Sequence, residues 1–121
     1  MIQADSGILK DTVIQKLQEL NVNYYVLQRS KCNTIAFTTL NGRRREFEVT
    51  FLKDRKYLIS TRFLGYVDVL IRNGYDVISG NDPDGRRRIY RLKLDDTEKV
   101  NNIIYEMLES GYSSNPQICL I

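Results

Sequence analysis

Two arginine clusters are the residues of this 121-residue chain that are best suited to binding chemistry. The segments NGRRREF, residues 41–47, and DGRRRIY, residues 84–90, each place three consecutive arginines directly after a turn dipeptide. A guanidinium is a planar fork of N–H donors that can bind a phosphate or a carboxylate through two parallel hydrogen bonds. The two clusters therefore predict a surface that binds anions.

The positive charge of the chain is concentrated around these clusters. The net charge is only +3, but residues 29–56 and residues 86–93 each sum to +5, whereas residues 94–121 sum to −4. A polyanionic partner responds to such a local concentration more than to the net value. We therefore predict that the anion-binding residues are the two triads and the basic residues beside them: Arg43, Arg44, Arg45, Arg86, Arg87, Arg88, Arg91, Lys93, Arg29 and Lys31.

No pattern typical of catalysis or metal binding accompanies the arginines. The chain has no histidine, which removes the Ser-His and Cys-His dyads and the most common metal ligand. Two cysteines, Cys32 and Cys119, are too few for a zinc site with four ligands. Catalysis by lysine or carboxylates alone stays open, but nothing in the sequence indicates it. We expect a binding protein and not an enzyme, with no catalytic residue, no metal and no cofactor.

Length and composition are typical of a single globular domain, residues 1–121. No stretch approaches the ~20 apolar residues of a membrane-spanning helix, and we expect no membrane contact. The N-terminal segment MIQADSGILK lacks the basic and then apolar pattern of a signal peptide. Two cysteines far apart in the chain are typical of free thiols in a reducing compartment. The expected location is therefore the cytoplasm.

Three segments have the hydrophobic period of an amphipathic helix: residues 7–20, 61–73 and 96–110. The expected capping residues are Ser6 for the first helix, Ser60 or Thr61 with Gly74 for the second, and Asp95 or Asp96 with Gly111 for the third. The side chains expected in the core are Leu9, Val13, Ile14, Leu17, Leu20, Phe63, Val67, Leu70, Ile71, Val100, Ile103, Ile104, Met107 and Leu108.

The segments between these helices are rich in β-branched and aromatic residues, which favour strands. The predicted strands are residues 22–29, 34–40, 45–52, 75–79 and 88–94, and the tail QICLI is an optional last strand. Asn41-Gly42 is a strong hairpin signal, and the loop GNDPDG joins a second hairpin. The predicted fold is α+β, an antiparallel sheet with helices packed on one face, in the order α-β-β-β-α-β-β-α(-β), and two αββ-like halves are left open.

Alternation of side chains along the strands predicts which arginines lie together. Arg43 and Arg45 should share a face with the apolar residues that begin at Phe47, and Arg86 and Arg88 should share one with Tyr90. If the two hairpins are neighbours, these four guanidiniums converge. The residues expected to face solvent on the other side of the first strand are Arg44, Glu46, Glu48 and Thr50.

A structural role for the arginines is the competing interpretation. Arginines at hairpin ends keep edge strands soluble. The side chain of Arg45 can also pair with Glu48 or with the acidic third helix, which would absorb much of the positive charge.

Residues 70–94, LIRNGYDVISGNDPDGRRRIYRLKL, resemble the end of a winged-helix DNA-binding domain. In that family a recognition helix ends at Gly-Tyr and leads into a two-stranded wing with a basic loop. The resemblance implies that Arg62 and Arg72 on the helix and residues 86–88 on the wing face DNA. It covers only these 25 residues, and the strands predicted over residues 22–52 replace the helices that precede a recognition helix.

Three hypotheses for function follow. The leading one is a non-enzymatic module whose arginine-rich hairpins contact phosphates of RNA or DNA, with affinity from counterion release. The second is a small protein-binding inhibitor or accessory factor, of phage or mobile-element type, that acts on a nucleic-acid enzyme. Its contact surface would use the arginines and the eight tyrosines. The third is a binder of a small phosphorylated ligand. Self-association to a homo-oligomer stays open.

Overall fold

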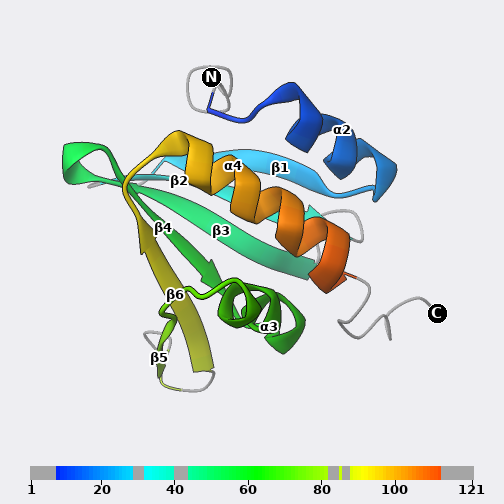
Figure 1. The fold of residues 1–121 in the computed structure, drawn as a ribbon. Helices are drawn as coiled ribbons and strands as arrows, with labels where there is room; N and C mark the ends of the chain where they lie inside the picture. The colour runs from blue at the N-terminus through cyan, green and yellow to red at the C-terminus, as the bar shows by residue number, and fades with distance from the viewer. Residues whose placement is uncertain (1–7, 29–31, 40–43, 82–84, 86–87, 113–121) are drawn as a thin grey trace.

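The computed structural model of the chain describes residues 8–28, 32–39, 44–81, 85 and 88–112. These residues form the predicted α+β fold, a six-stranded antiparallel sheet with three α-helices over one face (Figure 1). The strands lie in the order β1-β2-β3-β4-β6-β5. Their bounds are Asn23–Gln28 (β1), Asn33–Thr39 (β2), Arg44–Leu52 (β3), Lys56–Thr61 (β4), Ile78–Asn81 (β5) and Arg88–Leu94 (β6). The helices are Asp11–Glu19 (α2), Leu64–Arg72 (α3) and Thr97–Glu106 (α4).

The predicted helices α2 and α4 form where the hydrophobic period placed them. Val13 and Leu17 of α2 are buried one turn apart, but the N-cap of this helix is Lys10 rather than Ser6, which lies outside the described residues. The carboxylate of Asp96 accepts the backbone N–H groups of Glu98 and Lys99 and so caps α4, as predicted. None of the helices in the described part of the chain is long and apolar enough to cross a membrane.

Helix α3 differs in detail from its prediction. Its N-cap is Phe63, whose N–H is accepted by the hydroxyl of Thr61 at 3.1 Å, so neither Ser60 nor Thr61 is the cap. Gly74 follows the helix at φ +83°, the left-handed conformation expected of a C′ glycine. Ile71, expected in the core, is 57% exposed because the buried face of α3 is the one that carries Tyr66, Val67, Val69 and Leu70.

The core lies between the sheet and the helices, and aromatic rings fill the end of it near α3. The rings of Phe37 and Phe47 stack at 4.5 Å, and Tyr66 meets Phe47 edge-on at 5.2 Å. The third helix is closed by a π-helical turn, Met107–Gly111. A Cβ at Gly111 would lie 2.8 Å from Cδ1 of Tyr66, so glycine is what permits this close approach.

The sheet also contains a strand that the sequence did not predict. Strand β4 lies between β3 and β6 and pairs antiparallel with both. It is joined to β3 by a tight turn in which Asp54 and Arg55 have φ +62° and +57°. Because β4 is inserted between them, the two predicted hairpins, β2–β3 and β5–β6, are not adjacent.

Candidate anion-binding site

A β-bulge at Glu46 sets the direction of the first arginine triad. Phe37 of β2 lies opposite Phe47 of β3, but the next residue, Thr38, lies opposite Arg45. Glu46 is therefore an extra residue in β3. The residues of β3 that precede it point to the face opposite to the one that simple alternation predicts. As a result, Arg45 lies on the side of the sheet away from the helices, which we call the open face.

The bulge overturns two predictions about these residues. Arg45 does not share a face with Phe47, and the side chains of Arg44 and Glu46 are not in solvent, since they are 12% and 1% exposed. The Nε atom of Arg44 lies 2.7 Å from Oε2 of Glu46, and its guanidinium carbon lies 4.3 Å from the ring centre of Phe63. Strict alternation fails here because it assumes a strand without an inserted residue.

Glu46 joins β3 to three other elements of the fold through its side chain and its backbone. The hydroxyl of Tyr66 on α3 donates to Oε1 at 2.6 Å, and the hydroxyl of Thr39 on β2 donates to Oε2 at 3.1 Å. The backbone carbonyl of Glu46 accepts the hydroxyl of Thr61 on β4 at 2.9 Å. The hydroxyls of Tyr66 and Thr39, together with the cation of Arg44, compensate the buried charge of the carboxylate. We refer to Thr39, Arg44, Glu46 and Tyr66 as the Glu46 cluster. It makes Arg44 a structural residue rather than a surface contact.

Tyr112, just after the π-helical turn, makes the stability of the protein near this cluster depend on pH. Burial raises the pKa of the Tyr112 phenol, the negative charge of Glu46 raises it further, and Arg44 opposes the shift. The pKa of the phenol is higher in the folded state than in the unfolded state. The protonated phenol therefore contributes its full share to the free energy of unfolding below the unfolded pKa of about 10. This contribution is lost as pH rises through the folded pKa.

We therefore expect Tyr112→Phe to weaken the loss of stability above a pH of about 10. Urea unfolding at several alkaline pH values would compare the variant with the original chain. All other side chains are the same in both proteins, so the difference between the two profiles isolates the phenol. Identical profiles would contradict the environment described for Tyr112.

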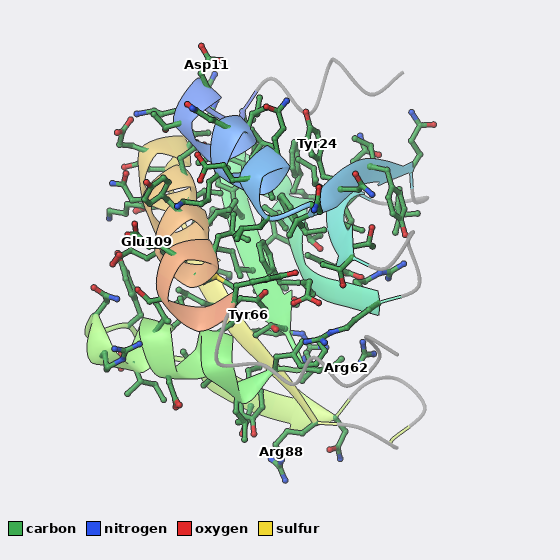
Figure 2. The ribbon with its side chains drawn as sticks, turned by 90° about the vertical axis from the view of Figure 1, so that its right-hand side faces the viewer. Asp11, Tyr24, Arg62, Tyr66, Arg88 and Glu109 are labelled. Carbon is green, nitrogen blue, oxygen red and sulfur yellow. The ribbon has the colours of Figure 1, made fainter. Side chains whose placement is uncertain are left out.

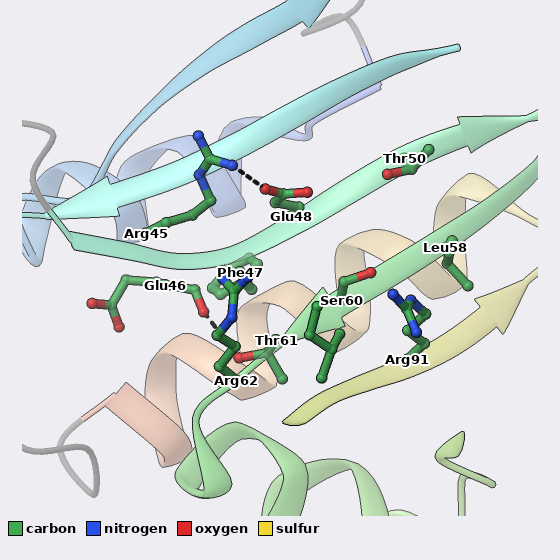
Figure 3. Close-up of a pocket in the computed structure, with 11 residues that line it drawn as sticks. Arg45, Glu46, Phe47, Glu48, Thr50, Leu58, Ser60, Thr61, Arg62 and Arg91 are labelled. Carbon is green, nitrogen blue, oxygen red and sulfur yellow. Dashed lines mark hydrogen bonds and ion pairs between the residues drawn. The ribbon is translucent and has the colours of Figure 1, made fainter. Parts of the chain in front are cut away.

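The open face carries one row of residues that crosses all six strands. In strand order the row is Tyr25, Ala36, Glu48, Ser60, Arg91 and Ile78. The short side chain of Ser60 stands between those of Glu48 and Arg91, which lie two strands or about 10 Å apart. A hollow of about 370 Å³ lies at this place, and its lining includes Thr50, Ser60 and Arg62 (Figure 3).

Three guanidiniums surround this hollow, which we call the arginine hollow. Arg45 lies on β3, Arg91 on β6, and Arg62 directly after the end of β4. Glu48 provides the carboxylate on the open face, because the carboxylate of Glu46 accepts the hydroxyl of Tyr66 on α3 and so points to the helical layer. The lining side chains therefore leave an excess of positive charge beside the hydroxyl of Ser60.

Arg45 is held in place by two neighbours. It forms an ion pair with Glu48, which confirms the pairing considered from the sequence, and it donates to the hydroxyl of Tyr25 on β1 at 3.2 Å. Burial opposes the charge of Arg45, but the hydrogen bond to Tyr25 and the charge of Glu48 outweigh it and raise the pKa of Arg45. Ala36 separates Tyr25 from Glu48 in the row, and its small side chain leaves room for the guanidinium.

Arg91 differs from Arg45, since it has no ion pair with any described residue. Ser60 and Ile78 flank it on the neighbouring strands. The guanidinium of Arg91 lies beside Gly80, where an added Cβ would be 3.5 Å from Nη1, at ordinary van der Waals contact. Arg91 is therefore available to an incoming anion.

The other predicted residues lie elsewhere. Lys93 is exposed on the open face, opposite Leu58. Arg88 has the same parity along β6 as the core-facing Leu92 and Leu94, donates to Oγ of Ser79 at 3.4 Å and points away from the body of the protein (Figure 2). The predicted convergence of Arg45 with Arg88 is therefore wrong, because the two lie on opposite faces of the sheet. The predicted residues Arg29, Lys31, Arg43, Arg86 and Arg87, the turn Asn41-Gly42 and the tail QICLI lie outside the described residues.

Arg62 is the residue of the arginine hollow that the charge analysis missed, because β4 was not predicted. The winged-helix resemblance placed Arg62 on the recognition helix, but α3 begins at Leu64. Strand β6 also pairs with β4 as well as with β5, so the second hairpin is part of the main sheet and not a separate wing. The structure thus contradicts this resemblance.

The arginine hollow has the chemistry of an anion site. Guanidinium groups and a hydroxyl offer hydrogen-bond donors to oxyanions. No group of three or more potential metal ligands occurs among the residues that the structure describes. Comparisons of the chain with protein-family models, with curated proteins and with solved structures each found no match.

Proposed function

We propose that this protein is a non-enzymatic module that binds phosphates of a nucleic-acid strand on the open face of its sheet. The observation that carries the proposal is the arginine hollow, in which Arg45, Arg62 and Arg91 surround a depression next to Glu48. An oxyanion placed there would be close to several guanidiniums at once. This differs from the turn-based surface first expected, because the contact residues come from β3, from β6 and from the residue that follows β4.

The composition of the hollow favours contacts to the nucleic-acid backbone over contacts to bases. Arginine and hydroxyl side chains are the groups that most often contact phosphate and sugar. Thr50 and Ser60 add hydroxyls to the lining, and its one aromatic residue, Phe47, is buried in the core and presents no ring on which bases could stack. Affinity would therefore come mainly from released counterions and depend little on sequence.

Fluorescence anisotropy with labelled single- and double-stranded oligonucleotides tests the proposal. We expect the affinity to fall between about 50 and 200 mM salt, with a log–log slope of about −2 for a single strand that places three phosphates at the arginines. Oligonucleotides of unrelated sequence should bind similarly. If no binding occurs at the lowest salt concentration, the proposal is wrong.

A small phosphorylated ligand is the second candidate, and the size of the hollow favours it. At about 370 Å³ the hollow lies within the range of small-molecule sites, which is about 300–1,000 Å³. A mononucleotide should then compete fully with an oligonucleotide at similar concentration. A strand that contacts several arginines should instead bind more tightly as its length increases. The protein-inhibitor hypothesis stays a prediction.

Glu48→Gln is expected to raise the affinity for nucleic acid about fivefold, because it frees Arg45 from its ion pair. A partly exposed ion pair is worth about 1 kcal/mol at most, which corresponds to that factor. Glu48 holds Arg45 and adds negative charge beside the hollow, and glutamine keeps its shape without that charge. Glu109→Gln, in the helical layer (Figure 2), changes the net charge equally and serves as the control. Equal gains in the two variants would assign the effect to net charge and not to the hollow.

A further inference from the structure

The two edges of the sheet differ in how well they are protected from pairing with another chain. Edge strands of soluble proteins are usually short or carry charges, prolines or bulges. Strand β5 is four residues long and includes Gly80. Strand β1, with the sequence NYYVLQ, is six residues long and has no charged residue, proline or glycine. Its register with β2 is unbroken over all six residues, so it contains no bulge.

The side chains of β1 have the character of an interior strand. The central residues Tyr24, Tyr25, Val26 and Leu27 are aromatic, β-branched or aliphatic, and all four are only half-buried. Tyr24 packs towards the core, with its ring 6.2 Å from that of Phe37, and Tyr25 lies on the open face. The strand therefore has residues of high β propensity on both faces, together with a free hydrogen-bonding edge in the described sheet.

We propose that β1 pairs antiparallel with β1 of a second copy of this chain and so forms a two-fold symmetric dimer with one continuous sheet. Self-pairing brings no like charges together, because β1 carries none. The other edge is less suited, because β5 is only four residues long and contains Gly80.

Symmetry restricts the register of this pair. If the two-fold axis is perpendicular to the sheet, residues opposite each other must point to the same face. Of the registers that meet this condition, the two that pair the most residues of β1 place the axis at Tyr25 or at Val26. In the second case Tyr25 lies opposite the partner's Leu27, an aromatic–aliphatic pair of the kind that stabilises sheets. Both arrangements keep the helices of the two copies on one side.

The dimer would also join the two open faces. Arg45 reaches over β2 to Tyr25 on β1, so the guanidiniums of both copies would lie on either side of the seam. The dimer does not depend on the proposed nucleic-acid binding, because the contacts that form it lie within β1. It would present two arginine hollows on one continuous surface.

Sedimentation velocity of the full chain at about 1–100 μM tests the proposal without nucleic acid, over a range that spans micromolar dissociation constants. We expect a dimer, and we expect Leu27→Lys to raise its dissociation constant about tenfold, because lysines then face the partner strand. Ile78→Lys is the matched control on the other edge, since Ile78 is on the same face and 73% exposed. It should leave the dimer unchanged.

Disulfide trapping gives a second readout that does not require the lysine variant to fold. Val26→Cys and Tyr25→Cys, each made with Cys32→Ser and Cys119→Ser, place a thiol at one of the two axis positions. Opposite Cβ atoms in a sheet are about 4.5–5.5 Å apart, close to disulfide range. One of the two should give a covalent dimer on mild oxidation, and Ile78→Cys should not.

Three results would overturn the proposal. The first is a chain that is monomeric over the whole concentration range. The second is open-ended aggregation instead of a closed dimer. The third is dissociation by Ile78→Lys with no effect of Leu27→Lys. None of these results bears on nucleic-acid binding, which is measured separately.

Discussion

Replacing Arg44 by methionine is expected to lower the free energy of unfolding by about 3–5 kcal/mol, the typical cost of removing one partner of a buried ion pair. The carboxylate of Glu46 is 1% exposed and would lose its cation while it remains between the sheet and α3. Methionine can still pack against Phe63, so the loss would come mainly from the uncompensated charge. Denaturant unfolding monitored by circular dichroism measures it.

The neighbouring residue provides the control for this prediction. Arg45→Met removes the same side chain one position later, but its ion pair with Glu48 is partly exposed and should be worth about 1 kcal/mol or less. Adding Glu46→Gln to Arg44→Met should recover part of the stability, because no buried charge then remains. Equal losses in Arg44→Met and Arg45→Met would show that the Glu46 cluster is not buried as described.

The double substitution Arg62→Ala and Arg91→Ala is expected to weaken nucleic-acid binding about 100-fold, since each hydrogen bond to a charged group is worth about 1.5 kcal/mol or more. Both side chains line the arginine hollow. The salt dependence should also become shallower by about 1.4 in slope for a single strand, the share of two phosphate contacts. The anisotropy titration described above measures both quantities.

A variant with the same net charge controls for long-range electrostatics. Arg72 on α3 and Lys99 on α4 are exposed residues of the helical layer, and changing both to alanine removes two positive charges away from the hollow. We expect this variant to bind almost as well as the original chain. If both double variants lose affinity equally, the positive charge of the protein acts as a whole and the hollow is not the binding site.

Much of the fold follows from local sequence signals. The stripe that begins at Val100, together with the capping carboxylate of Asp96, indicates α4, and the structure confirms both. Strand β4 carried no such signal. Its turn uses left-handed Asp54 and Arg55, whereas glycine or asparagine is the usual mark of that conformation. Without a recognisable turn before them, the strand-forming residues Tyr57, Ile59 and Thr61 were not recognised as a separate strand.

The site was less predictable than the fold. Pairing of Arg45 with Glu48 was readable from their closeness in the chain, but the bulge at Glu46 was not. Residues 43–46, which precede Phe47, are all charged. No apolar side chain among them therefore marks the position of the bulge. The arginine hollow depends on the register of three strands, which places Ser60 between Glu48 and Arg91. Such long-range pairing cannot be derived from local patterns.

The Glu46 cluster has a consequence for how this domain opens. Sheet ends next to turns usually fray, and their amide hydrogens exchange with solvent through small local openings. Here β2 ends and β3 begins at residues that bind Tyr66 of α3 through a buried carboxylate. Opening this end would expose an ion pair and release a helix at the same time. The slowest-exchanging amides should therefore include this end of the sheet, which gives the neighbouring arginines a rigid support.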